Sequence, residues 1–101
     1  MEIQIQAVGF KADQKLLDFA NSKIQKLAQF SDNLVLAEVF FRLEHATDEE
    51  NKISEIKIEL PGTELFAKKQ SKTFEDATDQ AIEAIRKQLL KVKEKAQENK
   101  K

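Results

Sequence analysis

The chain has 101 residues, of which 41% are hydrophobic and 35% charged, and its formal net charge is −1. This length and composition predict one folded, highly charged domain with a single core. The lack of cysteine excludes disulfides and thiol chemistry, and no apolar run approaches the roughly 18 residues of a membrane span. The N-terminus also lacks the features of a signal peptide, so we expect a cytoplasmic protein that makes no contact with a membrane.

The first 30 residues predict a strand followed by a helix. Residues 2–8 alternate between apolar and polar side chains, which is the pattern of a half-buried strand. Asp13 is a good N-cap, because its carboxylate can accept a hydrogen bond from a free N–H of the first helical turn. The helix is expected over residues 14–29, and its apolar face consists of Leu16, Leu17, Ala20, Ile24, Leu27 and Ala28.

Three further strands are predicted over residues 34–44, 52–60 and 63–69, with Pro61-Gly62 as the turn between the last two. The side chains expected to face the core are Val35, Ala37, Val39, Phe41, Leu43, Ser54, Ile56, Ile58, Leu60, Leu65 and Ala67. The opposite face carries the apolar side chains of Leu34, Leu36, Phe40 and Ile53. This exposed apolar group is either the ordinary surface of an antiparallel sheet or a surface for protein contact.

A long helix is predicted from Thr73 to about Gln97. Its apolar residues recur every three or four positions and form one stripe, as in a helix that packs on a core. Acidic residues precede basic ones along the helix, an order that the helix dipole favours. Lys87, Lys91 and Lys95 follow one another at four-residue spacing, where like charges repel slightly. These lysines are therefore either a solvated face or a surface for an anionic partner, and this helix alone leaves both possibilities open.

The predicted element order is β-α-β-β-β-α. It indicates an α+β domain of two layers, in which two helices pack on one face of a four-stranded sheet. The first two strands should be parallel and the remaining neighbours should pair as hairpins. We expect a single domain over residues 1–97 and a short flexible tail over residues 98–101. The order ends in the β-β-β-α of double-stranded-RNA-binding domains.

Signatures of catalysis are lacking. The only histidine, His45, lies in a polar loop without a second histidine or a cysteine that would complete a metal pair or a nucleophilic site. Gly9 and Gly62 are isolated, so the chain has no glycine-rich loop to hold a phosphate. We therefore expect no catalytic residues, no metal and no cofactor.

Binding is the remaining possibility, and the distribution of charge favours it. Residues 1–65 hold seven basic and twelve acidic residues, whereas residues 66–101 hold ten and six. If the helices pack side by side, their lysines border one groove or ridge, extended by Lys68, Lys69 and Lys72. Such a surface favours a phosphate backbone. Because the chain has seven phenylalanines but no tyrosine or tryptophan, we expect structured RNA, and not unpaired bases or DNA, as the partner.

Several stretches together resemble one family. They are the opening I-Q-I-Q-A-V-G, the first-helix run L-L-D-F-A-N-S-K-I-Q-K-L, and T-F-E-D-A-T-D-Q-A-I followed by I-R-K-Q-L-L-K-V-K-E-K in the last helix. The chain resembles the short ribosome hibernation-promoting factors, also called ribosome-associated inhibitors or sigma-54 modulation proteins. The resemblance runs from the first strand to the last helix. Phe74 stands where the family usually has tyrosine.

The resemblance implies the same fold and a protein without enzymatic activity. It also implies binding to small-subunit ribosomal RNA in the channel for messenger and transfer RNA, with inhibition of translation during stationary phase or stress. The RNA contacts that it implies are Lys23, Lys26, Lys87, Lys91, Lys93 and Lys95, with Arg86 as a further candidate on the opposite flank of the last helix. We expect a monomer off the ribosome.

Two other functions remain open at this point. The chain is alternatively a protein-interaction module that uses the sheet face around Leu36 and Phe40, or a general binder of structured RNA. The sequence also leaves open whether the protein promotes ribosome dimers or keeps ribosomes single.

Overall fold

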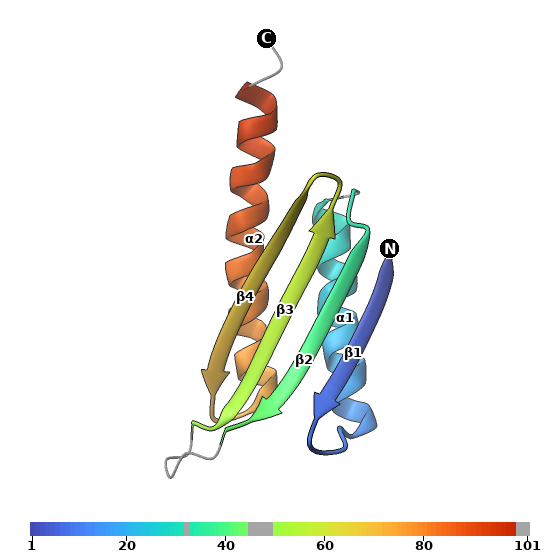
Figure 1. Ribbon diagram of the computed structural model, residues 1–101, viewed down its shortest axis with the longest axis vertical. Coiled ribbons are helices and arrows are strands. Elements are labelled where there is room, and N and C mark those ends of the chain that lie inside the picture. Colours follow the sequence, from blue (N-terminus) through green and yellow to red (C-terminus); the bar gives the residue numbers. More distant parts are fainter. Residues whose placement is uncertain (32, 45–49, 99–101) are drawn as a thin grey trace.

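The computed structural model describes residues 1–31, 33–44 and 50–98, and the side chains of the last helix as far as Glu94. The elements are β1 (Glu2–Val8), α1 (Gln14–Phe30), β2 (Leu36–Leu43), β3 (Lys52–Leu60), β4 (Thr63–Ser71) and α2 (Phe74–Glu98). The predicted order is confirmed, and both helices cover the same face of the sheet (Figure 1). The domain is therefore the predicted α+β arrangement of two layers.

The sheet has the strand order β1-β2-β3-β4, with β1 parallel to β2 and the other neighbours antiparallel. The α1 crossover explains the parallel pair, because two parallel neighbouring strands cannot be joined by a tight turn. Between β3 and β4, Gly62 adopts a φ of +79°, in the left-handed region that glycine enters without steric cost. This pairing confirms the predicted topology.

Both helices begin at a capping side chain. The backbone N–H of Leu16 donates to Asp13 Oδ1 at 2.9 Å, as predicted for the start of α1. The backbone N–H of Asp76 donates to Thr73 Oγ1 at 3.0 Å, so Thr73 is the cap of α2 and not its first residue. At its other end α2 continues to Glu98 and extends beyond the ends of the strands (Figure 1).

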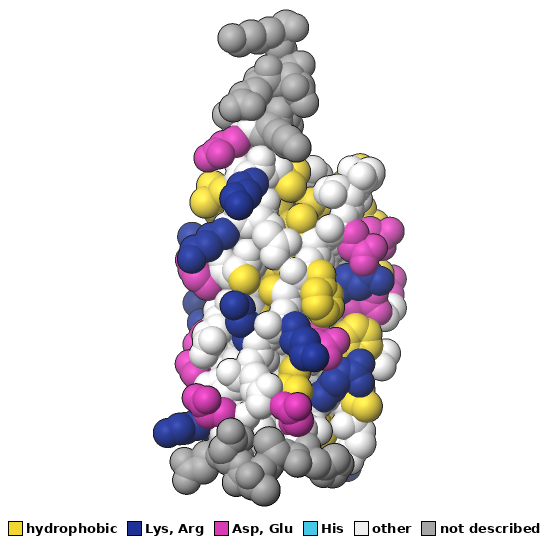
Figure 2. Space-filling view, turned by 60° about the vertical axis from the view of Figure 1, so that its left-hand side comes forward, with side chains coloured by type: hydrophobic (Ala, Val, Ile, Leu, Met, Phe, Trp, Pro, Cys, Tyr) yellow, Lys and Arg dark blue, Asp and Glu magenta, His cyan; other side chains and the backbone are white. Residues whose placement is uncertain are grey.

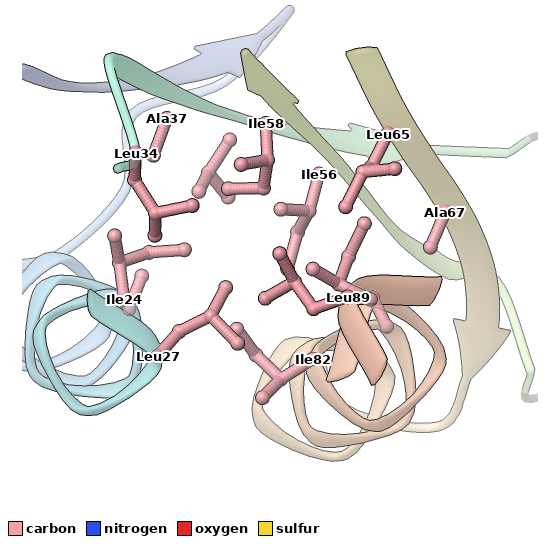
Figure 3. Close-up of a cluster of buried hydrophobic side chains, with 14 of the residues drawn as sticks. Ile24, Leu27, Leu34, Ala37, Ile56, Ile58, Leu65, Ala67, Ile82 and Leu89 are labelled. Carbon is pink, nitrogen blue, oxygen red and sulfur yellow. The ribbon is translucent and has the colours of Figure 1, made fainter. Parts of the chain in front are cut away.

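The core lies between the sheet and the two helices. Ile24 and Leu27 of α1 and Ile82 and Leu89 of α2 point toward the sheet, where they meet apolar side chains of β2, β3 and β4 (Figure 3). One polar pair is buried in this layer: Thr78 Oγ1 donates to Ser54 Oγ at 3.1 Å. Since neither hydroxyl has access to water, the bond favours one position of α2 on β3.

Some of the predicted faces in the sheet are wrong. Leu34, predicted on the outer face, is buried at 7% exposure, whereas Val35, predicted to face the core, is 50% exposed. Both residues precede β2, so the alternation of the strand does not apply to them, and Leu34 points into the core (Figure 3). Leu43 is 42% exposed because it is the last residue of β2.

Ile53, predicted on the outer face, does lie there but is only 6% exposed. Its cross-strand neighbours are Arg42 in β2 and Gln70 in β4. Long side chains on both neighbouring strands can cover a central residue, because directly opposed positions on one sheet face are in contact. The predicted lack of a catalytic role for His45 concerns a residue outside those that the structure describes. Of the flexible tail predicted over residues 98–101, Glu98 is the last residue of α2, and residues 99–101 lie outside the described residues.

Candidate nucleic-acid interface

The basic residues of α2 lie on two flanks of the helix. Successive residues of an α-helix differ by about 100° in direction, so Arg86 and Lys87 point to different sides. Arg86 approaches the ring of Phe30 at the end of α1, with 5.5 Å between Cζ and the ring centroid. Gln88, on the other flank, donates from Nε2 to the backbone oxygen of Phe66 in β4 at 2.9 Å. Of the lysines predicted to border one groove or ridge, those of α2 do not line the groove between the helices.

The flank of α2 that faces α1 borders a groove of about 630 Å³, called the interhelical groove below. Its lining residues are Lys23, Lys26, Leu27, Gln29, Phe30, Asp79, Ile82, Glu83 and Arg86. Three of the predicted RNA-binding residues, Lys23, Lys26 and Arg86, thus come together here from two helices. Arg86, predicted to stand apart from the lysines, shares this groove with those of α1.

Acidic side chains compensate part of the positive charge in the interhelical groove. Lys23 Nζ lies 3.0 Å from Asp79 Oδ1, and Arg86 lies 3.5 Å from Glu83 Oε2. Lys26 has no ionic partner among the residues that the structure describes. Two of the three cations are therefore held in place by carboxylates that also weaken the local positive field.

Lys93 continues this flank beyond the groove. It donates from Nζ to the backbone oxygen of Phe30, and the same Nζ lies 4.4 Å from the centroid of the Phe30 ring. Because α1 has no basic residue in its last turn, Lys93 provides the positive charge that the carbonyl end of the helix favours. Lys93 is thus tied to the fold as well as being available at the surface.

The surface of α2 outside the interhelical groove, called the β4-side flank below, carries Lys87 and Lys91. Both are exposed, and neither has an ionic partner within the described part of the chain. Figure 2 looks toward α2 and β4, and Lys and Arg side chains recur along the helix there with acidic side chains among them. The side chain of Lys95, predicted on the same ridge, lies outside those that the structure describes.

Comparison with known proteins places this arrangement in a family. Residues 3–97 match the family described as sigma 54 modulation protein / S30EA ribosomal protein. The chain belongs to this family. Membership indicates a ribosome-associated protein and not a member of a class of enzymes. No match was found among curated protein sequences.

Two solved structures share the fold of this S30EA family member. A ribosomal subunit interface protein from Coxiella burnetii is 22% identical, with a TM-score of 0.82 over 92% of this chain and 98% of that one. The N-terminal domain of Protein Y from Thermus thermophilus is 20% identical, with a TM-score of 0.74 over 87% and 94% of the two chains. These likenesses confirm the β-α-β-β-β-α fold.

The outer face of the sheet in this S30EA family member carries a network of ion pairs. Lys57 Nζ lies 3.0 Å from Glu64 and 4.0 Å from Glu38, and Arg42 Nε lies 2.7 Å from Glu55. The hydrogen bond and the negative charge of Glu64 raise the pKa of Lys57 above 10.5. Among the residues at this face, positive charge is largely balanced by neighbouring carboxylates.

The apolar residues of the same outer face are exposed to different degrees. Leu36 and Phe40, the proposed centre of such a surface, are both half-buried. Arg42 also approaches Phe40, with 5.7 Å between Cζ and the ring centroid. Phe66 is more open, at 51% exposure. The apolar group around Leu36 and Phe40 is therefore partly covered by neighbouring side chains.

Within residues 1–31, 33–44 and 50–98, no group of three or more His, Cys, Asp or Glu side chains could hold a metal ion. None of the helices described is long and apolar enough to cross a membrane.

Phe30 is the member of the interface that sequence reasoning missed. The first helix was predicted to end at residue 29, but α1 continues to Phe30, whose ring meets Arg86 and Lys93 from α2. The spacing of those two cations, seven residues or two helical turns apart on one flank, was a signal that both point toward the same neighbour.

Proposed function

We propose that this protein binds the small ribosomal subunit in the channel for messenger and transfer RNA and thereby inhibits translation while ribosomes are stored in stationary phase or stress. The free protein is a monomer and needs no cofactor. Small-subunit RNA is bound by Lys23, Lys26, Arg86, Lys87, Lys91, Lys93 and Lys95. The folded body then excludes messenger and transfer RNA.

One observation carries the proposal: Lys23, Lys26 and Arg86 converge from two helices on the interhelical groove. A groove that collects cations from separate elements suits a phosphate backbone, since each phosphate contact releases counterions and strengthens binding. Family membership and the printed name of the Coxiella burnetii protein, a ribosomal subunit interface protein, support the ribosome as the source of that RNA.

Shape supports the occlusion step. The protein measures 52 × 24 × 18 Å along its principal axes, and its sheet and helices form one packed body. A body of this kind excludes other ligands from a channel without performing any chemistry. Recognition through phosphate groups also requires no stacking of bases on aromatic side chains, which agrees with the absence of tyrosine and tryptophan from the chain.

The test is co-sedimentation of the purified protein with ribosomes and isolated subunits on sucrose gradients. Wild type is run beside two charge-reversal variants, Lys26→Glu/Arg86→Glu and Lys87→Glu/Lys91→Glu, with Lys57→Gln as the control on the outer sheet face. We expect wild type and the control to travel with the small subunit and both reversal variants to remain at the top of the gradient. Wild type that stays at the top at modest salt would overturn the proposal.

A competition experiment distinguishes a protein specific for the ribosome from one that binds structured RNA in general. Plain RNA duplex is added before sedimentation, at concentrations from equal to that of the small subunits up to a large excess. We expect the protein to stay on the small subunit, because a duplex offers phosphates but not the shape of the channel. Complete displacement by an equal concentration of duplex would instead indicate a general binder of structured RNA.

A further inference from the structure

Phe30 brings a ring, a carbonyl oxygen and two cations together at one point. It is the last residue of α1 and is half-buried against the core. Its ring centroid lies 5.5 Å from Arg86 Cζ and 4.4 Å from Lys93 Nζ, and its backbone oxygen accepts a hydrogen bond from Lys93. Both distances are within the roughly 6 Å at which an aromatic ring attracts a cation.

An aromatic ring and a carboxylate hold a cation in different ways. The ring attracts the charge through its quadrupole but carries no net charge of its own. Lys23, in contrast, lies against Asp79 at 3.0 Å, so its positive charge is largely balanced before any ligand arrives. Lys93 can therefore be ordered by Phe30 while most of its charge remains available to an anion. Arg86 is ordered by the same ring, but part of its charge is balanced by Glu83 at 3.5 Å.

Order matters here because arginine and lysine are the side chains that lose the most rotamer freedom when they are fixed. A side chain that is already held near its bound position loses less on binding. Phe30 also lines the interhelical groove together with Lys26 and Arg86. The ring thus stands at the place where the groove meets the exposed end of α2.

We propose that Phe30 is a positioning residue for RNA binding, which holds Arg86 and Lys93 ready for the phosphates of one RNA segment that enters the interhelical groove. This inference rests on the proposed function, and it deepens it by assigning a role to a side chain that makes no phosphate contact itself. Phe30 acts through the two cations, so its effect must become smaller when one of them is removed.

The test is a double-mutant cycle measured by binding to purified small subunits. Phe30→Leu removes the ring but keeps an apolar side chain at the edge of the core, and Phe30→Tyr keeps the ring face. We expect Phe30→Leu to weaken binding about fivefold, as two exposed cation–π contacts suggest, and Phe30→Tyr to retain wild-type affinity. Thermal unfolding confirms that each variant is folded, and Phe30→Met takes the place of Phe30→Leu if the latter is not.

The cycle combines Phe30→Leu with Arg86→Gln, and separately with the matched variant Lys87→Gln on the β4-side flank. We expect Arg86→Gln to cost less affinity in the Phe30→Leu background than in wild type, whereas Lys87→Gln costs the same in both. Equal costs of Arg86→Gln in both backgrounds would show that Phe30 only packs, and would overturn the inference while leaving the proposed function intact. Wild type that fails to bind small subunits would overturn both.

Discussion

The two flanks of α2 carry similar charge but differ in how that charge is held. On the interhelical side, Arg86 is held by Glu83 and the ring of Phe30, and Lys93 by the end of α1. On the β4-side flank, Lys87 and Lys91 extend into solvent without an ionic partner in the described part of the chain. One flank is ordered and partly neutralised, and the other is free and fully charged.

The difference suggests that the two flanks of α2 contribute to RNA binding in different ways. Free lysines contribute to long-range attraction and to the salt dependence of binding, because each adds its whole charge to the field. Held cations contribute position, because little rotamer freedom remains to be lost when they meet a phosphate. A count of lysines along the sequence cannot separate these contributions, since both flanks give the same composition.

Charge reversal in the groove should have the largest effect. Lys26→Glu/Arg86→Glu replaces two cations by two anions beside Asp79 and Glu83, so phosphate would meet four carboxylates in one groove. We expect affinity for small subunits to fall on the order of a hundredfold at physiological salt. Equilibrium sedimentation titrations measure this change. A loss no greater than that of Lys87→Glu/Lys91→Glu would contradict the special role of the groove.

Neutralising the β4-side flank should have a smaller effect with a distinct signature. Lys87→Gln/Lys91→Gln removes two free charges, so we expect about tenfold weaker binding and a salt slope that is shallower by about 1.4 to 1.8. Stability should stay the same or rise by a few tenths of a kcal/mol, because the like charges four residues apart no longer repel. Binding titrations at several KCl concentrations and urea unfolding test both parts. An unchanged slope would exclude these lysines from the interface.

Removing a carboxylate from the groove should strengthen binding. Asp79→Asn frees Lys23 from its ion pair at 3.0 Å and takes one negative charge away from the path of the phosphates. We expect affinity to rise about threefold, with a loss of stability below about 1 kcal/mol because the pair is partly exposed. Weaker binding by a folded Asp79→Asn variant would show that the ion pair positions Lys23 for RNA and does not compete with it.

The fold was largely predictable from the sequence because its signals are local. Strand alternation gave the bounds of β1 and β3, and the carboxylate of Asp13 marked the start of α1. The errors lie at strand ends and on the outer face, where Leu34 and Ile53 are buried by neighbours distant in the sequence. The alternation of apolar and polar residues predicts on which face of a sheet a side chain lies, but not which other side chains cover it.

The candidate site was predictable only as a set of residues. Lys23, Lys26 and Arg86 were all named in advance, yet their meeting in one groove depends on which flank of α2 faces α1. The buried hydroxyl pair of Thr78 and Ser54 and the contact of Gln88 with β4 are among the interactions that favour this rotation of the helix. Neither of these contacts can be predicted from the local sequence pattern of α2, whereas the spacing of Arg86 and Lys93 indicated that they share a neighbour without identifying it as Phe30.

The smallest effect on RNA binding is expected from substitution of a lysine on the sheet, the layer opposite the helices. Lys57 pairs with Glu64 and Glu38 on the outer sheet face, away from both flanks of α2. Its pKa is raised above 10.5, chiefly by the hydrogen bond and charge of Glu64, so the charged form is the one that the fold favours. The contribution of this pair to stability is therefore complete below pH 10.5 and is lost as the pH rises further.

We accordingly expect the stability difference between wild type and Lys57→Gln, measured by urea unfolding, to be constant from pH 7 to about pH 10 and to shrink above that. Affinity for small subunits should stay within about twofold of wild type, because no phosphate contact is lost. A marked loss of affinity in the folded variant would mean that the partner meets the sheet as well as the helices. The contrast between the two flanks of α2 would then describe only part of the interface.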